Sequence, residues 1–281
     1  MIAMSWWNSV VLGAVEGLTE FLPISSTGHL TIVEKWMGFK VDDDGITAFT
    51  AIIQIGAILA VMLYLRTDVK NIVRGWVRGV FRPEYRTDPY YRFGWLVILG
   101  SIPIGIVGVA FQHQIETTLR SLWLVGSALI VFSGVLWLAD RLAVQRRGES
   151  EIGARDVVFV GVAQCLALIP GVSRSGATMS AGLVRGFDRV TVTRLSFFLS
   201  IPALVAAGAL EVATKHDDIS HGVGWGRTLV ATAVSFVVGY VAVAWLLRFI
   251  SRHTFNAFVL YRVALGVAVL ALVGAGALAA T

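Results

Sequence analysis

Two carboxylates, Glu16 and Glu20, stand close together in a strongly apolar part of the chain. Side chains four residues apart share one face of a helix, so the two acids are neighbours if this segment is helical. Close carboxylates repel each other, and a bound cation or a shared proton relieves that repulsion. The pair therefore indicates a divalent-metal site or a proton-sharing dyad. The alternative is that both side chains lie at an aqueous rim and have no role.

The octapeptide PISSTGHL, residues 23–30, follows these acids and combines hydroxyl groups with a histidine. Ser26 and His29 are three residues apart and face the same way if a helix begins near Ser25. A hydroxyl beside an imidazole is the smallest nucleophile-and-base pair. The alternative is structural, with a serine that caps a helix and a histidine ring that packs against its neighbours.

A second polar stretch, PGVSRSGAT at 170–178, carries the opposite charge. Arg174 is the only basic residue between Arg155 and Arg185, and a guanidinium group binds phosphate oxygens with two parallel hydrogen bonds. Hydroxyl groups surround it, and glycines allow close backbone approach. These residues are Ser173, Ser175, Thr178, Gly171 and Gly176.

A helix is expected to start at each polar stretch. A helix N-terminus attracts anions through its free N–H groups and its dipole. The first stretch adds the hydroxyl groups of Ser25, Ser26 and Thr27 to this arrangement. Two helix N-termini, several hydroxyls and an arginine predict an anion site, with phosphate as the best match. Ordinary N-capping by serines is the alternative, but capping does not account for the arginine.

The composition shows where these residues must be placed. The chain has 281 residues, 56% of them hydrophobic and only 15% charged, with a mean hydropathy of +0.76. Soluble domains carry about 25% charged residues, so the chain is expected to be an all-α integral membrane protein. The pI near 9.7 is explained by basic cytoplasmic loops, and no nucleic-acid partner is expected. No Lys or Arg precedes the first apolar run, which argues against a cleaved signal peptide.

Six apolar segments are long enough to cross a bilayer, which takes about 20 residues. They are 47–65, 93–111, 119–139, 192–213, 227–247 and 256–279. Two further apolar stretches, 6–38 and 155–187, are interrupted by PISSTG and PGVSRSG. Their arms are short for a crossing, so we expect two re-entrant helical hairpins, whose polar backbone must be satisfied by protein or by a watery cavity.

The distribution of basic residues supports this topology. If both hairpins return to the side from which they came, loops 66–92, 140–155, 185–194 and 248–252 share one side and hold most of the Lys and Arg. The positive-inside rule makes that side cytoplasmic and places both termini on the outer face. The outer side then holds fewer basic residues and an acidic run: Lys35, Lys40, Arg120, Lys215, Arg227 and 42–44.

The two interrupted stretches also resemble each other, as an alignment of 11–30 with 159–178 shows. Gly13 aligns with Gly161, Glu16 with Gln164, Ser25 with Ser173 and Gly28 with Gly176. Each half of the single membrane domain, 1–281, contains one hairpin and three crossings, which predicts an inverted-topology repeat of 1–139 and 154–281. Inverted repeats with broken helices place a binding site near the midplane, so the two breaks are expected to meet.

The runs EGLTEFLPISSTGHL and PGVSRSGAT resemble the two signature motifs of the undecaprenyl-diphosphate phosphatase family, also called bacitracin-resistance proteins. The resemblance extends over essentially the whole chain. It implies a multi-pass protein of the bacterial cytoplasmic (inner) membrane with a periplasm-facing site. This enzyme removes the terminal phosphate of undecaprenyl diphosphate, recycles the lipid carrier for peptidoglycan and other envelope polymers, and requires a divalent cation such as Mg²⁺ or Ca²⁺.

The resemblance also implies roles for individual residues. Catalytic roles fall on Glu16, Glu20, Ser26, His29 and Arg174, and the metal falls on Glu16 and Glu20. The diphosphate would be bound by Ser25, Thr27, Gly171, Ser173, Arg174, Ser175, Gly176 and Thr178. The favoured mechanism is attack by Ser26 with His29 as base, and direct attack by an activated water is the rival.

Several interpretations stay open. Broken helices in an inverted repeat are also typical of transporters, so the chain could carry or flip a polyprenyl phosphate or another anion. Arg262, about two turns into the last span, is expected to snorkel to the cytoplasmic interface, and contact with the substrate is the alternative. Basic residues spaced by four in 66–92 predict an amphipathic surface helix or a topology-setting loop. The expected partners are a polyprenyl diphosphate and membrane lipids, with a homodimer left open.

Overall fold

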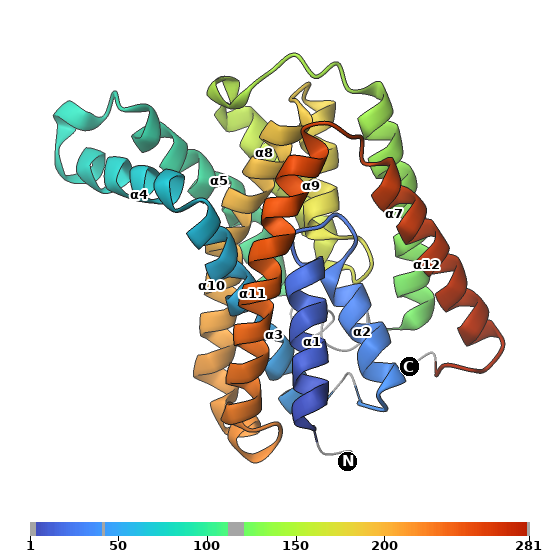
Figure 1. The fold of residues 1–281 in the computed structure, drawn as a ribbon. Helices are drawn as coiled ribbons and strands as arrows, with labels where there is room; N and C mark the ends of the chain where they lie inside the picture. Colours follow the sequence, from blue (N-terminus) through green and yellow to red (C-terminus); the bar gives the residue numbers. More distant parts are fainter. Residues whose placement is uncertain (1–3, 41–42, 112–120, 280–281) are drawn as a thin grey trace.

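Helices make up the architecture (Figure 1). The computed structural model describes residues 4–40, 43–111 and 121–279, and within these ranges there is no strand, only an isolated bridge between Arg147 and Phe187. The first two residues of the predicted span 119–139 lie outside the described residues. The all-α fold class predicted from composition is confirmed.

Six helices are long and apolar enough to cross a membrane, and each overlaps the span predicted for it. They are α3 (Asp44–Tyr64), α5 (Pro89–Ala110), α7 (Leu122–Leu142), α10 (Arg189–His221, kinked at Lys215), α11 (Trp225–Ile250) and α12 (Asn256–Gly274). The protein is therefore a multi-pass membrane protein.

Each interrupted stretch forms two short helices around a break. The first pair is α1 (Trp6–Thr19) and α2 (Ser26–Trp36), and the second is α8 (Ala154–Gln164) and α9 (Arg174–Val184), with a 3-10 turn, η4 (Cys165–Leu168), after α8. The pairs extend from opposite ends of the bundle, so that both breaks lie between those ends (Figure 1). Re-entry from one membrane face and the inverted repeat stay predictions.

The first four basic residues of the long loop, Arg66, Lys70, Arg74 and Arg78, lie on a helix, α4 (Arg66–Phe81), which agrees with the surface-helix interpretation, whereas Arg82 and Arg86 lie beyond its end. α4 runs back against α5 and projects sideways from the bundle (Figure 1). Gly75 and Gly79 lie on the contact face, where Tyr90 and Tyr91 of α5 fill the space that a Cβ would take. Short 3-10 turns complete the fold: η1 (Pro83–Tyr85) and η3 (Glu149–Glu151).

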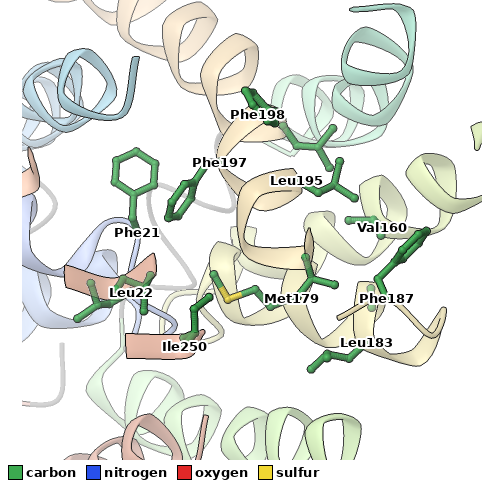
Figure 2. Packing of buried hydrophobic residues seen from close by; sticks show 14 of the residues in the cluster. Phe21, Leu22, Val160, Met179, Leu183, Phe187, Leu195, Phe197, Phe198 and Ile250 are labelled. Carbon is green, nitrogen blue, oxygen red and sulfur yellow. The ribbon is translucent and has the colours of Figure 1, made fainter. Parts of the chain in front are cut away.

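A continuous apolar core joins the first break to the second helix pair (Figure 2). Phe21, in the first break, meets Phe197 of α10 edge to face, with ring centroids 5.1 Å apart. Leu22 and Met179 of α9 belong to the same cluster. Because aromatic pairs of this geometry add to the stabilisation from area burial, the core fixes the first break against α9 and α10.

Candidate active site

The two breaks meet, as the sequence predicts. The backbone N–H of Gly171 in the second break donates to Ser25 Oγ in the first at 3.1 Å, and Ser175 Oγ donates to the carbonyl of Leu22 at 2.7 Å. Gly171 has a φ of +98°, and a Cβ there would collide with the carbonyl of Val125. Glycine is therefore required here, because its φ is in the left-handed region and the second break packs directly against the backbone of α7.

Glu20 lies at the centre of the site and connects the two breaks chemically. Its Oε2 accepts a hydrogen bond from Ser26 Oγ at 2.5 Å, and its Oε1 is paired with Arg174 Nη2 at 2.9 Å. The Glu20 and Arg174 side chains are 4% and 10% exposed, so this ion pair is almost dehydrated. Charge-assisted bonds of this kind are short and strong, and they hold Ser26 and Arg174 on opposite oxygens of one carboxylate.

Arg174 keeps hydrogen-bonding capacity beyond this pair. Its Nη1 is buried and has no hydrogen-bond partner among the described residues. Its guanidinium also lies over the ring of Phe21, 5.9 Å from the centroid. A buried N–H without a partner is costly, so an incoming anion that accepts this donor gains the full value of the bond.

Glu16 is the second acid and is fully buried, one turn before Glu20. Neither of its carboxylate oxygens has a hydrogen-bond partner among the described residues. Its charged neighbours are Glu20, Arg174 and Glu34. An orphaned carboxylate in this position fits a bound cation, because hard cations such as Mg²⁺ take carboxylate oxygens and often need only one or two from the protein.

His29 is oriented by two partners. Its Nδ1 lies 2.7 Å from the carbonyl oxygen of Ser25, and its Nε2 lies 2.7 Å from the hydroxyl of Tyr261. A carbonyl only accepts, so Nδ1 carries a proton, and in the neutral ring Nε2 accepts from the tyrosine. Both ring nitrogens are thereby occupied, and the Ser26 hydroxyl donates to Glu20 rather than to His29.

The remaining predicted ligands act as structural groups in this state. Ser25 and Ser173 cap α2 and α9, since their hydroxyls accept from the backbone N–H groups of Gly28 and Gly176. Ser175 and Thr178 are 1% exposed, and Thr178 donates to Ser196 of α10. Thr27, in contrast, is exposed at the start of α2. The capping alternative is thus realised, and whether these groups also bind phosphate stays a prediction.

Arg262 is the residue whose placement the sequence interpretation missed. Snorkelling to the interface is wrong, because Arg262 is fully buried. Its Nη1 donates to the carbonyl of Pro23 at 3.0 Å, and its Nη2 donates to those of Gly171 and Val172 at 2.9 Å each. The breaks lack helical hydrogen bonds, so their free carbonyls offer the guanidinium partners that water would otherwise supply.

A signal for this placement was present in the sequence. A charged residue inside a membrane span is rare and usually faces the interior of the bundle. Tyr261 and Arg262 are consecutive on α12, and one contacts His29 while the other contacts both breaks. α12 therefore supplies a third element of the site, beside the two helix pairs.

The fold and the site define a multi-pass α-helical membrane protein with a buried carboxylate, serine and arginine assembly where two broken helices meet. The family model described as "Bacitracin resistance protein BacA" matches residues 9–268, and the chain belongs to this family. It is 63% identical to undecaprenyl-diphosphatase 3 of Frankia casuarinae, over 99% of this chain and 100% of the relative. It is 54% identical to undecaprenyl-diphosphatase of Cutibacterium acnes, over 96% and 98%. It is 48% identical to undecaprenyl-diphosphatase of Mycolicibacterium smegmatis, over 99% and 100%.

Proposed function

We propose that this protein hydrolyses undecaprenyl diphosphate to undecaprenyl phosphate and inorganic phosphate. Relatives with this activity in their names match 96% to 99% of the chain, and the family named for bacitracin resistance matches residues 9–268. The observation that supports the chemistry is the contact of Ser26 and Arg174 with the two oxygens of Glu20. Recycling of the lipid carrier for peptidoglycan and other envelope polymers follows from this reaction.

Phosphate binding falls to Arg174 and to the N-termini of α2 and α9. The Nη1 group of Arg174 donates to none of the residues that the structure describes, and the fork of a guanidinium fits phosphate oxygens. Both helices begin at the breaks, so their dipoles favour a negative charge there. In phosphoryl transfer, positioning and charge stabilisation supply nearly all of the rate enhancement, and these groups supply both.

Ser26 is the proposed nucleophile. Its proposed base is Glu20 in place of His29, because Ser26 Oγ donates to Glu20 while both His29 ring nitrogens have other partners. Ser26 Oγ forms a bond to the terminal phosphorus while the bond from that phosphorus to the bridging oxygen breaks, and undecaprenyl phosphate leaves. The hydroxyl proton passes to Glu20, which already accepts it as a hydrogen bond. Water then hydrolyses the phosphoserine. The rival is direct attack by water, activated by His29 or a glutamate.

His29, Tyr261 and Arg262 have positioning roles in this proposal. Tyr261 and the Ser25 carbonyl fix the orientation of the imidazole ring. Arg262 fixes the backbone of both breaks and adds a buried positive charge beside the anion site. A displacement of reacting groups by about 1 Å can cost a factor of about 100 in rate, so rigidity in the breaks has direct catalytic value.

Glu16 and Glu20 would hold a divalent cation, Mg²⁺ or Ca²⁺, with Glu16 as the main ligand, because the Glu20 oxygens already bind Ser26 and Arg174 and would share any bond to the cation with them. When bound, the cation would polarise phosphoryl oxygens and neutralise their developing charge. The free oxygens of Glu16 are the feature that fits it. No group of three His, Cys, Asp or Glu gathers in the described part of the chain, but a Mg²⁺ ion that also binds substrate phosphate does not require one.

The membrane placement is also a proposal. The end of the bundle that carries α4 and the loops after α7 and α9 is rich in arginine, which makes it cytoplasmic by the positive-inside rule. The pair α1 and α2 then re-enters from the periplasmic face of the inner membrane, toward which the site opens. The polyprenyl chain of the substrate stays in lipid while its diphosphate reaches the breaks.

The test is phosphate release from a polyprenyl diphosphate by purified protein in detergent. Wild type and Arg155→Gln, an exposed arginine on α8, are expected to be active, whereas Glu20→Gln, Ser26→Ala and Arg174→Gln lose activity. EDTA abolishes release, and Mg²⁺ or Ca²⁺ restores it. Isolation of phosphoserine at residue 26 supports the covalent route, and full activity of Ser26→Ala excludes it.

The breaks also suit a carrier, so transport is the second candidate function. Transfer of a labelled polyprenyl phosphate across vesicles distinguishes the two. Transfer without phosphate release by the wild type would replace the phosphatase proposal. Transfer that persists in Glu20→Gln, alongside release by the wild type, would show that both functions coexist.

A further inference from the structure

An apolar groove of about 470 Å³ lies between α7, α8 and α9. α9 packs against both α7 and α8, so α9 forms the floor and the other two helices form the walls. None of the side chains assigned to the phosphatase site lines it. The groove is therefore a separate feature of the second helix pair.

The shape of the groove follows from side-chain size. Its floor carries small residues, Ala177, Ser180 and Ala181, while bulky residues of α7 and α8, such as Phe132 and Phe159, form the walls. The hydroxyl of Ser180 donates to the carbonyl of Gly176 at 2.7 Å, so a bound molecule does not have to accept this hydrogen bond. The volume is within the range of ligand pockets, about 300–1,000 Å³, and the lining suits an unbranched apolar chain.

One end of the groove is cationic. The Arg185 guanidinium lies over the ring of Phe159, a wall residue, at 6.0 Å from the centroid. Arg185 is also paired with Asp156, but Arg147 binds the same carboxylate, so two cations share one anion. The Arg185 side chain is 39% exposed. Glu151 also acts on Arg147, so these charges nearly balance, and the exposed Arg185 guanidinium is the cationic group at the rim.

Arg146 adds a second positive charge at the same end. Its backbone N–H donates to the carbonyl of Gly186 at 3.0 Å, and Gly186 lines the groove. The Arg146 side chain is exposed, and it forms no ion pair with any other residue that the structure describes. An apolar channel that ends at two arginines is complementary to a chain with an anionic head.

We propose that this groove binds one acyl chain of an anionic phospholipid, with the lipid phosphate at Arg146 and Arg185. Wall residues such as Leu138 and Leu142 are exposed, so the groove opens sideways to the bilayer, where such chains are present. A zwitterionic headgroup brings its own cation toward the arginines and gains less. Each arginine near an anionic lipid is expected to change binding about fivefold.

The experiment is native mass spectrometry of the purified full chain after incubation with phosphatidylglycerol or phosphatidylcholine of the same acyl chains. The wild type is expected to retain phosphatidylglycerol at several-fold higher occupancy. Arg146→Gln/Arg185→Gln removes this preference, and Arg146→Gln alone lowers it about fivefold even if the double variant is unstable. Ala181→Leu fills the floor and lowers the retention of both lipids.

The matched control is Arg248→Gln/Arg252→Gln, which removes two exposed charges at the C-terminal end of α11, a helix that does not line the groove. Its lipid preference is expected to equal that of the wild type. Equal retention of both lipids by the wild type would overturn the proposal, and so would an equal loss in the control variant. A dimer that Ala181→Leu dissociates, without any change in lipid retention, would assign the groove to a second copy of the chain instead.

Discussion

The break before α2 and the break before α9 end in the same way but carry different chemistry. Ser25 has a φ of 74° and Ser173 a φ of 75°, and each serine hydroxyl accepts from the backbone N–H three residues later. The next residue is Ser26 in the first break and Arg174 in the second, and both bind Glu20. The same backbone conformation therefore places a serine hydroxyl on one side of Glu20 and an arginine on the other.

The difference shows that the scaffold and the chemistry can be separated. Both breaks contain a capping serine with a positive φ and bonds to the other break. The charged or reactive side chain differs between them. Loss of a residue after the cap should affect the rate, and loss of a cap should affect the stability.

Replacement of Arg174 should have the largest effect. Arg174→Gln is expected to lower kcat by about 100-fold or more, because it removes charge stabilisation where the phosphoryl group is transferred. Arg174→Lys should recover only a small part, since lysine keeps the charge without the fork. Phosphate release at saturating substrate is the measurement, and a loss of only a few-fold would contradict the assignment.

Arg262 donates hydrogen bonds to both breaks, so its replacement should lower the free energy of unfolding. Arg262→Met leaves three break carbonyls without donors, and the expected cost is about 3 kcal/mol or more. Thermal unfolding in detergent measures this, and Arg252→Met, an exposed arginine beyond α11, is the control. Equal melting temperatures for the two variants would show that the breaks hold together without Arg262.

The two helix pairs also differ in the contacts that join their outer ends, and this difference makes the stability of the second pair depend on pH. α1 and α2 are joined by apolar contacts around Met4 and Phe39, whereas α8 and α9 are joined through Asp156. Burial alone would raise the pKa of Asp156, but hydrogen bonds from Arg147, Arg185 and the Gly153 N–H outweigh it and lower the pKa to about 2.

Because the folded state favours the ionised form of Asp156, the protein is expected to lose stability as pH falls. The stabilisation, about 2 kcal/mol, is fully present above the unfolded pKa of about 3.9 and is lost as pH falls toward 2. Melting temperatures between about pH 2 and pH 6 measure it. Asp156→Asn should be less stable at neutral pH and should lose this part of the pH dependence. An unchanged pH slope in that variant would contradict the prediction.

The smallest effects belong to the caps. Ser173→Ala should cost about 1 kcal/mol, the usual value of an N-cap hydroxyl. Each serine makes one further bond: Ser173 Oγ pairs with Ser175 Oγ, and Ser25 Oγ accepts from Gly171 N–H across the breaks. Ser25→Ala should cost more, because it leaves the buried Gly171 N–H without this acceptor. The difference in melting temperature between the two variants is the measurement. A larger loss in Ser173→Ala would show that the contact between the breaks adds no stability.

Some features of the fold and the site could be predicted from the sequence, and others could not. Hydropathy and length are enough to locate the six spans and both breaks, since each is a property of contiguous sequence. The Glu20 bond to Ser26 could not be predicted, because it depends on how residues 21–25 fold back. The snorkelling predicted for Arg262 failed because depth along a helix does not show which neighbour it faces, nor that this neighbour has free carbonyls.

Arg262 binds only main-chain oxygens of the breaks, at Pro23, Gly171 and Val172. Main-chain oxygens are the same in every amino acid, so the side chains at these three positions can drift without loosening the contact. Correlated substitutions between position 262 and the breaks are therefore not expected, and contact maps inferred from covariation would omit a side chain that joins all three elements of the site.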